Sequence, residues 1–244
     1  MTIICNPPAA APSLADTVNC EAVLLARTVP EETRDGAVTV CSAWWQPTLG
    51  LIRVYPMPLA SGQEAWRRYR LELTRSGRDA RWRSFKLADG GPIDCADAHS
   101  ARDRLHAHLA GSATTIAQLN QKRDSLGVVR PVSSINLDLE RGAPDRSREF
   151  GRKTFEIRPY LRFDDADGSH RLALNEWGCY EFIRKGGDPA RLNLRLDDPG
   201  REQLLLVGNL RDHPTTWVVI AVVGYDAVQP ALFVQPPGRG QSAP

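Results

Sequence analysis

The chain has 244 residues, a formal net charge of +2, 42% hydrophobic residues and 25% charged residues. Its length suffices for one large or two small domains with their own cores, and its composition is that of an ordinary globular protein. A net charge so close to zero excludes a global basic field, so any contact with nucleic acid must come from a local patch.

Residues 1–20, rich in Ala and Pro, are predicted to be a flexible N-terminus without the features of a signal peptide. The apolar run at 216–223 is too short to cross a bilayer, so we expect no membrane partner. The cysteine pattern has an odd count and no CxxC spacing, which argues against a disulfide framework or a Cys-rich zinc site and fits a reducing cytoplasm. The cysteines are Cys5, Cys20, Cys41, Cys95 and Cys179.

Residues 37–58, AVTVCSAWWQPTLGLIRVYPMP, contain two runs of β-forming residues on either side of a turn at 46–48. This pattern predicts a β-hairpin. Strand alternation sends Leu51, Arg53 and Tyr55 to one face, which makes the Arg/Tyr face the one that could touch a ligand. We expect the opposite face to be buried, with Val38, Val40, Ile52 and Val54.

Residues 21–95 predict an N-terminal β module. Residues 66–75 alternate between apolar and polar side chains, which is typical of a strand with one wet face, and residues 81–87 alternate as well. Residues 96–127 then predict a pair of helices, the first ending at Gly111 and the second capped by Ser112 and ending at Gly127. Its histidines, including His106, are expected at the surface.

Residues 128–235 predict a second β-rich module. Its first strand, at 128–140, is interrupted at Pro131, and residues 171–185 read as a strand followed by a helix. Further strands are expected at 155–163 and in the apolar runs 203–209 and 215–225, which suit strands buried on both faces. Residues 141–153 are expected to form an exposed loop, and residues 236–244 a disordered tail. The predicted class is α+β, mainly antiparallel β, with two small barrel-like β modules separated by a helical pair.

A segment with alternating basic and aromatic residues, 75–86, is the first candidate site. Cations that hold phosphates and aromatic rings that stack on bases are the means by which proteins bind single strands. The alternative is a solvated strand edge whose Trp and Phe enter the core. With the Arg/Tyr face of the hairpin, the predicted nucleic-acid-binding residues are Arg53, Tyr55, Arg78, Arg81, Trp82, Arg83 and Lys86.

The second candidate is an acidic cluster in a Gly-containing segment: Asp164, Asp165, Asp167 and His170. Such oxygen ligands could hold a divalent metal, but the spacing does not match a calcium loop. A polar turn is the favoured interpretation, so we predict no metal and no other cofactor. There is no P-loop, dinucleotide fingerprint or activated nucleophile, and we assign no catalytic residue.

The hairpin VTVCSAWWQPTLGLIRVYP resembles a pattern in bacterial proteins from defence and nucleic-acid-modification neighbourhoods, closest to modules described as dual OB-fold domains. The residues that carry the resemblance are Cys41, Ser42, Ile52, Arg53 and Pro56, while Ala43 stands where the pattern has Gly. The resemblance implies β-barrel-like modules and association with nucleic acid, and it implies no catalytic residue.

The leading hypothesis is a non-catalytic nucleic-acid-binding or recognition subunit of a bacterial complex, with other protein subunits as partners and a role in anti-phage defence. One alternative is a metal-dependent nuclease or nucleic-acid-modifying enzyme built on the acidic cluster. The other is a protein–protein adaptor that does not contact nucleic acid.

Overall fold

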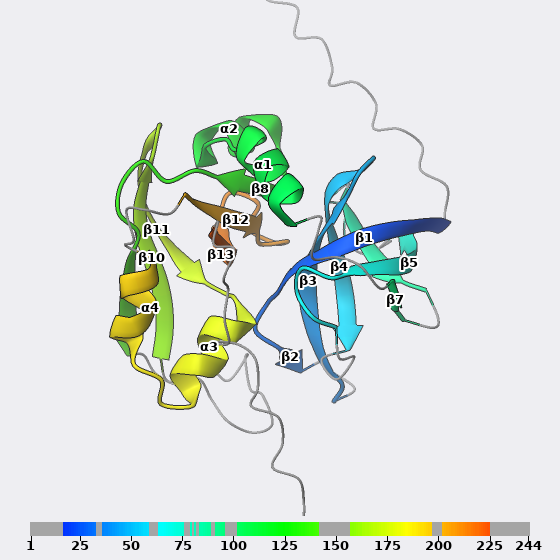
Figure 1. Ribbon diagram of the computed structural model, residues 1–244, viewed down its shortest axis with the longest axis horizontal. Helices are drawn as coiled ribbons and strands as arrows, with labels where there is room; N and C mark the ends of the chain where they lie inside the picture. Colours follow the sequence, from blue (N-terminus) through cyan, green and yellow to red (C-terminus); the bar gives the residue numbers. More distant parts are fainter. Residues whose placement is uncertain are drawn as a thin grey trace, which may run out of the picture.

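The structure is a computed structural model, and the part of the chain that it describes comprises residues 17–32, 36–58, 63–75, 79, 81, 83–88, 91–95, 102–141, 157–196 and 202–224. Most of the predicted loop at 141–153, the predicted tail at 236–244 and residues 1–16 of the predicted flexible start lie outside it. Two sheets and four helices make up this part, which confirms the predicted α+β class with mainly antiparallel strands (Figure 1).

The first sheet closes into a five-stranded barrel. Its strands follow one another in the order β1-β3-β4-β6-β5, and β5 pairs back with β1. Only β4 and β6 run parallel within this ring. The short strands β2 and β7 pair with β3 and β5 outside it. The bounds are β1 Thr17–Arg27, β2 Glu31–Glu32, β3 Val38–Gln46, β4 Gly50–Pro58, β5 Arg68–Arg75, β6 Ser84–Leu87 and β7 Ile93–Cys95.

The second sheet repeats this arrangement with one strand broken in two. Its order is β9-β10-β11-β13-β12-β8, and β11 and β13 are its parallel pair. The edge strands β8 and β9 are consecutive in the chain and are joined by residues 130–135, so together they act as one strand that closes the ring. The predicted interruption at Pro131 is confirmed. The bounds are β8 Leu126–Val129, β9 Asn136–Arg141, β10 Ile157–Asp165, β11 Gly168–Leu174, β12 Gln203–Asn209 and β13 Trp217–Gly224.

Both rings have the same topology. When β8 and β9 count as one strand, each ring has the order 1-2-3-5-4-1 with strands 3 and 5 parallel. This is the Greek-key order of an OB-fold. The helices α3 (Trp177–Arg184) and α4 (Pro189–Leu196) lie between the third and fourth strands of the second ring.

Each ring has its own apolar core, built from the inward-facing residues of alternating strands. In β5 the predicted alternation is confirmed, since Tyr69, Leu71 and Leu73 are buried and the residues between them are exposed. Trp44 lies fully buried in the first core, and its indole N–H donates to the Ser42 hydroxyl at 2.7 Å. That contact satisfies a polar group that would otherwise destabilise the core.

A third apolar cluster joins the two barrels. It combines outward-facing residues of β1, β3 and β4 with residues of β8, β12, β13 and the helix α1 (Arg102–Gly111). The strands β12 and β13 are buried on both faces, as predicted, because one face lines the second core and the other lies against the first barrel. The two barrels therefore pack as one unit.

The hairpin at 37–58 is confirmed, and Val40, Ile52 and Val54 are buried as predicted. Val38 is only half-buried. The strand β1 begins at Thr17, so residues 17–20, expected to be flexible, pair with β5.

The helical pair is present, but its second member is shorter than predicted. The helix α2 spans Ile116–Lys122, with Thr115 and not Ser112 as its N-cap, and it ends at Arg123, which takes a left-handed conformation. His106 is buried, contrary to its expected surface position, because it lies on the face of α1 that packs against the barrels. Within the described residues, no helix has both the length and the apolar character needed to span a bilayer.

Candidate functional site

The outer face of the second and third strands is where OB-folds bind oligonucleotides and oligosaccharides, together with the adjoining loops. Because the chain contains this topology twice, it has two such faces. They are the outer face of β3–β4 in the first barrel and that of β10–β11 in the second. The two differ in what covers them.

The β3–β4 face is covered by the second barrel. Ala43 and Leu51 are buried in the cluster that joins the barrels, and Trp45 packs against it. The strand β4 lies against β8, and β1 lies against β13. In this arrangement the face serves as a packing surface and offers no room for a ligand.

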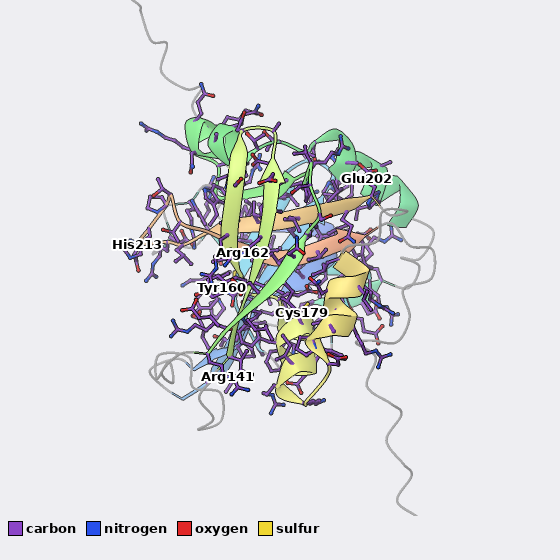
Figure 2. The ribbon with its side chains drawn as sticks, turned by 90° about the vertical axis from the view of Figure 1, so that its left-hand side faces the viewer. Arg141, Tyr160, Arg162, Cys179, Glu202 and His213 are labelled. Atoms are coloured by element: carbon purple, nitrogen blue, oxygen red, sulfur yellow. The ribbon has the colours of Figure 1, made fainter. Side chains whose placement is uncertain are left out.

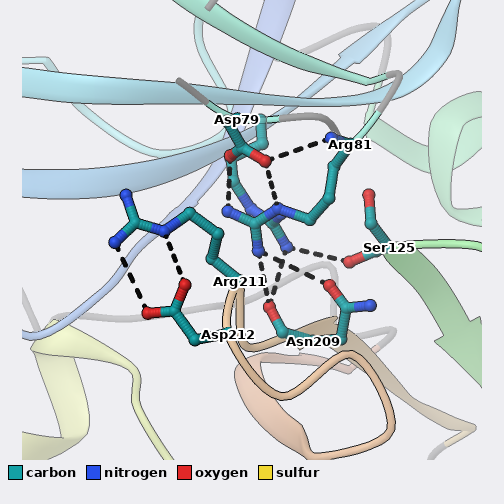
Figure 3. Close-up of polar contacts among 7 residues, drawn as sticks. Asp79, Arg81, Ser125, Asn209, Arg211 and Asp212 are labelled. Atoms are coloured by element: carbon teal, nitrogen blue, oxygen red, sulfur yellow. Dashed lines mark hydrogen bonds and ion pairs between the residues drawn. The ribbon is translucent and has the colours of Figure 1, made fainter.

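Arg53 lies in the middle of this covered face and is only 5% exposed. Its Nη2 donates to the carbonyl oxygens of Ser125 at 2.8 Å and Asn209 at 3.4 Å, both in the second barrel. Figure 3 labels these two acceptor residues. Gly208 is part of this fit, because a Cβ there would lie 3.0 Å from Nη2. Burial lowers the pKa of Arg53, but a guanidinium stays protonated at neutral pH.

Arg81 makes the same kind of contact from the first barrel. Its Nε donates to Asp79 at 2.7 Å and its Nη1 to the Asn209 carbonyl at 2.8 Å. Burial alone would raise the pKa of Asp79, but hydrogen bonds from Arg81 outweigh that effect and lower it to about 2. Arg53, Arg81 and Asp79 are hereafter called the arginine clamp.

The structure therefore brings together three of the residues predicted to bind nucleic acid, but not on an open surface. Arg53 and Arg81 bind backbone carbonyls of the second barrel, and Arg83 lies 4.0 Å from Asp124. The predicted contact of Arg53 with nucleic acid stays a prediction, but its contact with the second barrel was not predicted. The reason is that its two acceptors, Ser125 and Asn209, lie 72 and 156 residues away along the chain, so the sequence around Arg53 does not indicate them.

The remaining residues of that prediction are dispersed or not described. Tyr55 and Lys86 are half-buried on β4 and β6. Arg78 and Trp82 lie outside the described residues. A role of any of these residues in binding nucleic acid stays a prediction.

The acidic cluster forms the turn between β10 and β11 and is used within the fold. The Asp165 carboxylate accepts from the backbone N–H of Ile116 at 2.9 Å, of Asp167 at 2.9 Å and of Gly168 at 3.1 Å, and it lies 3.0 Å from His170 Nε2. Burial opposes ionisation of Asp165, but these hydrogen bonds hold its pKa below the ordinary value. The turn thus anchors the start of α2.

Asp167 accepts from the Thr115 hydroxyl, which adds a second contact between the turn and α2. In the ranges that the structure describes, no group of three or more His, Cys, Asp or Glu side chains is arranged to hold a metal ion. Asp164 differs from Asp165 and Asp167, because its side chain lines a pocket at the surface.

The β10–β11 face is not covered by any other part of the chain that the structure describes, and it carries charged and aromatic side chains. Tyr160 and Arg162 lie on β10, and Arg171 lies opposite Arg162 on β11 (Figure 2). The Arg171 guanidinium lies over the Tyr160 ring, 3.7 Å from its centre. This is a cation–π contact that holds both groups flat on the sheet.

Two carboxylates of β9 hold these arginines in place. Asp138 accepts from Arg162 Nη2 and Arg171 Nε, both at 2.9 Å, and Glu140 accepts from Arg171 Nη2 at 2.8 Å. Hydrogen bonds from Arg171 and Arg162 lower the pKa of Asp138. The arginine side chains remain exposed, with 61% and 38% of the surfaces of Arg162 and Arg171 accessible.

A shallow pocket of about 360 Å³ lies at one end of this face, between the β10–β11 hairpin and the segment that breaks the first strand. The broken segment is tied to β10, since Val132 N–H donates to the Asp164 carbonyl at 2.8 Å. Polar lining residues include Ser133, Asn136, Arg162, Asp164, Ser169 and Arg171.

No residue of this face was among the predicted nucleic-acid-binding residues. The alternation in β10 was visible and places Tyr160 and Arg162 on one face. The contribution of Arg171 and Asp138 depends on the register with β11 and β9, which no local signal specifies.

Comparisons with known proteins do not assign the chain to a family. No protein family and no curated protein matches its sequence. Among solved structures, it is similar to a chain described as tetrameric p202 HIN2, at 8% identity and a TM-score of 0.33, covering 85% of this chain and 90% of that one. A murine DNA-binding protein bound to double-stranded DNA is similar at 8% identity and a TM-score of 0.34, covering 89% of this chain and 99% of that one. At these values neither likeness supports a conclusion about this chain.

Proposed function

We propose that this protein binds single-stranded nucleic acid through the outer face of β10–β11. The observation that carries the proposal is the contrast between the two OB-type faces, because among the described residues only the second face is left uncovered, and it bears two exposed arginines beside a tyrosine. The strand order places these residues on the face that such barrels use for oligonucleotides.

The side chains fit the two parts of a single strand. Bases of single-stranded nucleic acid stack on aromatic rings or on guanidinium planes. Arg171, lying flat on Tyr160, provides such a plane, with the ring as its support. Arg162 lies next to it on the sheet and is positioned for a backbone phosphate.

The acidic partners of these arginines set the cost of binding. Asp138 and Glu140 neutralise the face in the free protein, so a phosphate must take over hydrogen bonds that the carboxylates now accept. Exposed ion pairs contribute only about 0–1 kcal/mol each, so this exchange costs little. The acids keep the guanidinium groups ordered without competing strongly for them.

The test is fluorescence anisotropy of a short labelled oligothymidine with the full chain over a series of salt concentrations. The double variant Arg162→Glu/Arg171→Glu should bind weakly and show a shallower salt dependence, by about 0.7 per lost phosphate contact. Tyr160→Ala should weaken binding by about 1–3 kcal/mol, the range for loss of base stacking.

The control is Arg68→Glu/Arg70→Glu on the first barrel. These two arginines are also exposed on neighbouring positions of a sheet, and both lie within 4 Å of one carboxylate, that of Glu21. This variant should bind as the parent does. Equal loss in both double variants, or a parent that binds no nucleic acid of any kind, would refute the proposal and favour the protein–protein adaptor.

The finer assignment is a non-catalytic subunit of a bacterial complex that acts in defence against phage in the cytoplasm. It rests on the resemblance of the hairpin alone. Copurification from the native host, with identification of bound proteins and nucleic acid, tests it. The nuclease alternative was based on the acidic cluster as a metal site. The cluster supports it less in this structure, because Asp165 and Asp167 accept hydrogen bonds from backbone and hydroxyl groups around α2.

A further inference from the structure

The pocket at the end of the β10–β11 face has a different chemistry from the face itself. The face presents guanidinium groups, whereas the pocket combines them with the Asp164 carboxylate and with hydroxyl and amide groups. A site for phosphate alone would gain nothing from a carboxylate. A mixture of donors and acceptors is typical of a site that reads the edge of a base.

The pocket owes its shape to the break between β8 and β9. Residues 130–135 leave the barrel there, and Ser133 and Ser134 form the wall opposite the hairpin. Its volume of about 360 Å³ is at the lower end of the range for small-ligand sites. A single splayed-out base fits this size, and the stacking plane of Arg171 borders the same pocket.

Asp164 is held in position and is ionised. The Ser133 hydroxyl accepts from its backbone N–H at 2.8 Å, which fixes the residue against the pocket wall. Hydrogen bonds from Ser169 and Ser133 lower the pKa of the carboxyl group. A carboxylate has about four acceptor positions, enough to accept two donors from a ligand.

We propose that this pocket takes one unpaired guanine, whose N1–H and N2–H groups donate to the Asp164 carboxylate. This inference rests on the proposed function, since the base belongs to a strand bound on the adjoining face. Guanine alone presents two adjacent donors on its Watson–Crick edge, which match the two oxygens of a carboxylate. Adenine and cytosine present an amino group next to an acceptor, and thymine and uracil present one donor between two carbonyls.

The test compares oligothymidine with the same strand carrying a single central guanine, using the full chain. The guanine should raise affinity at least about fivefold, the lower end of what a bidentate contact to a base discriminates. Replacing that guanine by inosine, which lacks the 2-amino group, should remove most of the gain. Because the change is made in the ligand, this comparison does not depend on the stability of a variant.

The protein variant is Asp164→Asn, which should bind oligothymidine as the parent does and lose the preference for guanine. Asp94→Asn, an exposed acid on the first barrel paired with Arg67, is the control and should keep it. Oligothymidine binding without a gain from guanine, or a gain that survives in Asp164→Asn, overturns this inference and leaves the proposed function standing. No binding of either strand overturns both.

Discussion

The two barrels use the same topological face in opposite ways. In the first, the outer face of β3–β4 is apolar around a buried arginine and lies against the second barrel. In the second, the outer face of β10–β11 holds exposed arginines beside acids and a half-buried tyrosine. The strand order is the same, so topology alone does not determine which face is free for a ligand.

The two arginine sets show the difference most clearly. Arg53 and Arg162 both lie on the outer face of a strand with aromatic residues nearby. Arg53 donates to carbonyl oxygens of the other barrel, whereas Arg162 donates to a single exposed carboxylate on its own sheet. A buried guanidinium must keep its partners, while an exposed one can exchange them. Three matched pairs of variants test this contrast through the free energy of unfolding.

The largest effect is expected for apolar packing. Leu51→Ala on the covered face should lower the free energy of unfolding by about 2–4 kcal/mol, because it leaves a cavity between the barrels. Tyr160→Ala on the β10–β11 face should lower it by less, about 1 kcal/mol, since the ring is only half-buried and its contact with Arg171 is made at the surface. Chemical denaturation measures both, and equal losses would show that the β3–β4 face is not the better covered of the two.

The second pair replaces one arginine on each face by methionine. Arg53→Met should cost about 2–3 kcal/mol, because buried carbonyl oxygens lose a charged donor. Arg162→Met should cost less than about 1 kcal/mol, as is usual for an exposed ion pair. Thermal melting of the two variants side by side checks this, and a neutral Arg53→Met would mean that the arginine clamp does not hold the barrels together.

The third pair concerns acids and depends on pH. Arginines lower the pKa of both Asp79 and Asp138. The pKa of Asp79, whose side chain is 12% exposed, falls to about 2, whereas the side chain of Asp138 is 29% exposed. A lowered carboxyl pKa adds stability above the unfolded-state pKa near 4, and this is lost as the pH falls toward 2. Asp79→Asn should therefore cost about 2 kcal/mol at neutral pH and progressively less below pH 4.

The matched variant Asp138→Asn should change the dependence of unfolding free energy on pH in the same direction but less than Asp79→Asn does, because solvent screens the more exposed pair. Denaturation curves between neutral and acidic pH measure both variants. An Asp79→Asn curve parallel to that of the parent protein at every pH would contradict the role of Asp79 in the clamp.

The sequence by itself determined the local structure. Period-two alternation identified the hairpin and β5, unbroken apolar runs identified β12 and β13, and Pro131 marked the break in a strand. These features follow from neighbouring residues, because alternation and turn chemistry act over a few positions. The start of α4 has a signal in Asp188 and Pro189 that was not used, since the Asp188 carboxylate accepts from the Ala190 N–H at 2.9 Å. The start of α2 depended on a cap, Thr115, that competes with Ser112 nearby.

The tertiary structure decided which surfaces remain free. Arg53 in an apolar strand and Arg162 in β10 look equally available in the sequence. Arg53 is buried and Arg162 is exposed because of contacts between residues far apart in the chain. Arg53 contacts Ser125 and Asn209, and Arg162 contacts Asp138. A side chain's burial and charge partners are set by how whole sheets pack, and no local pattern contains that information.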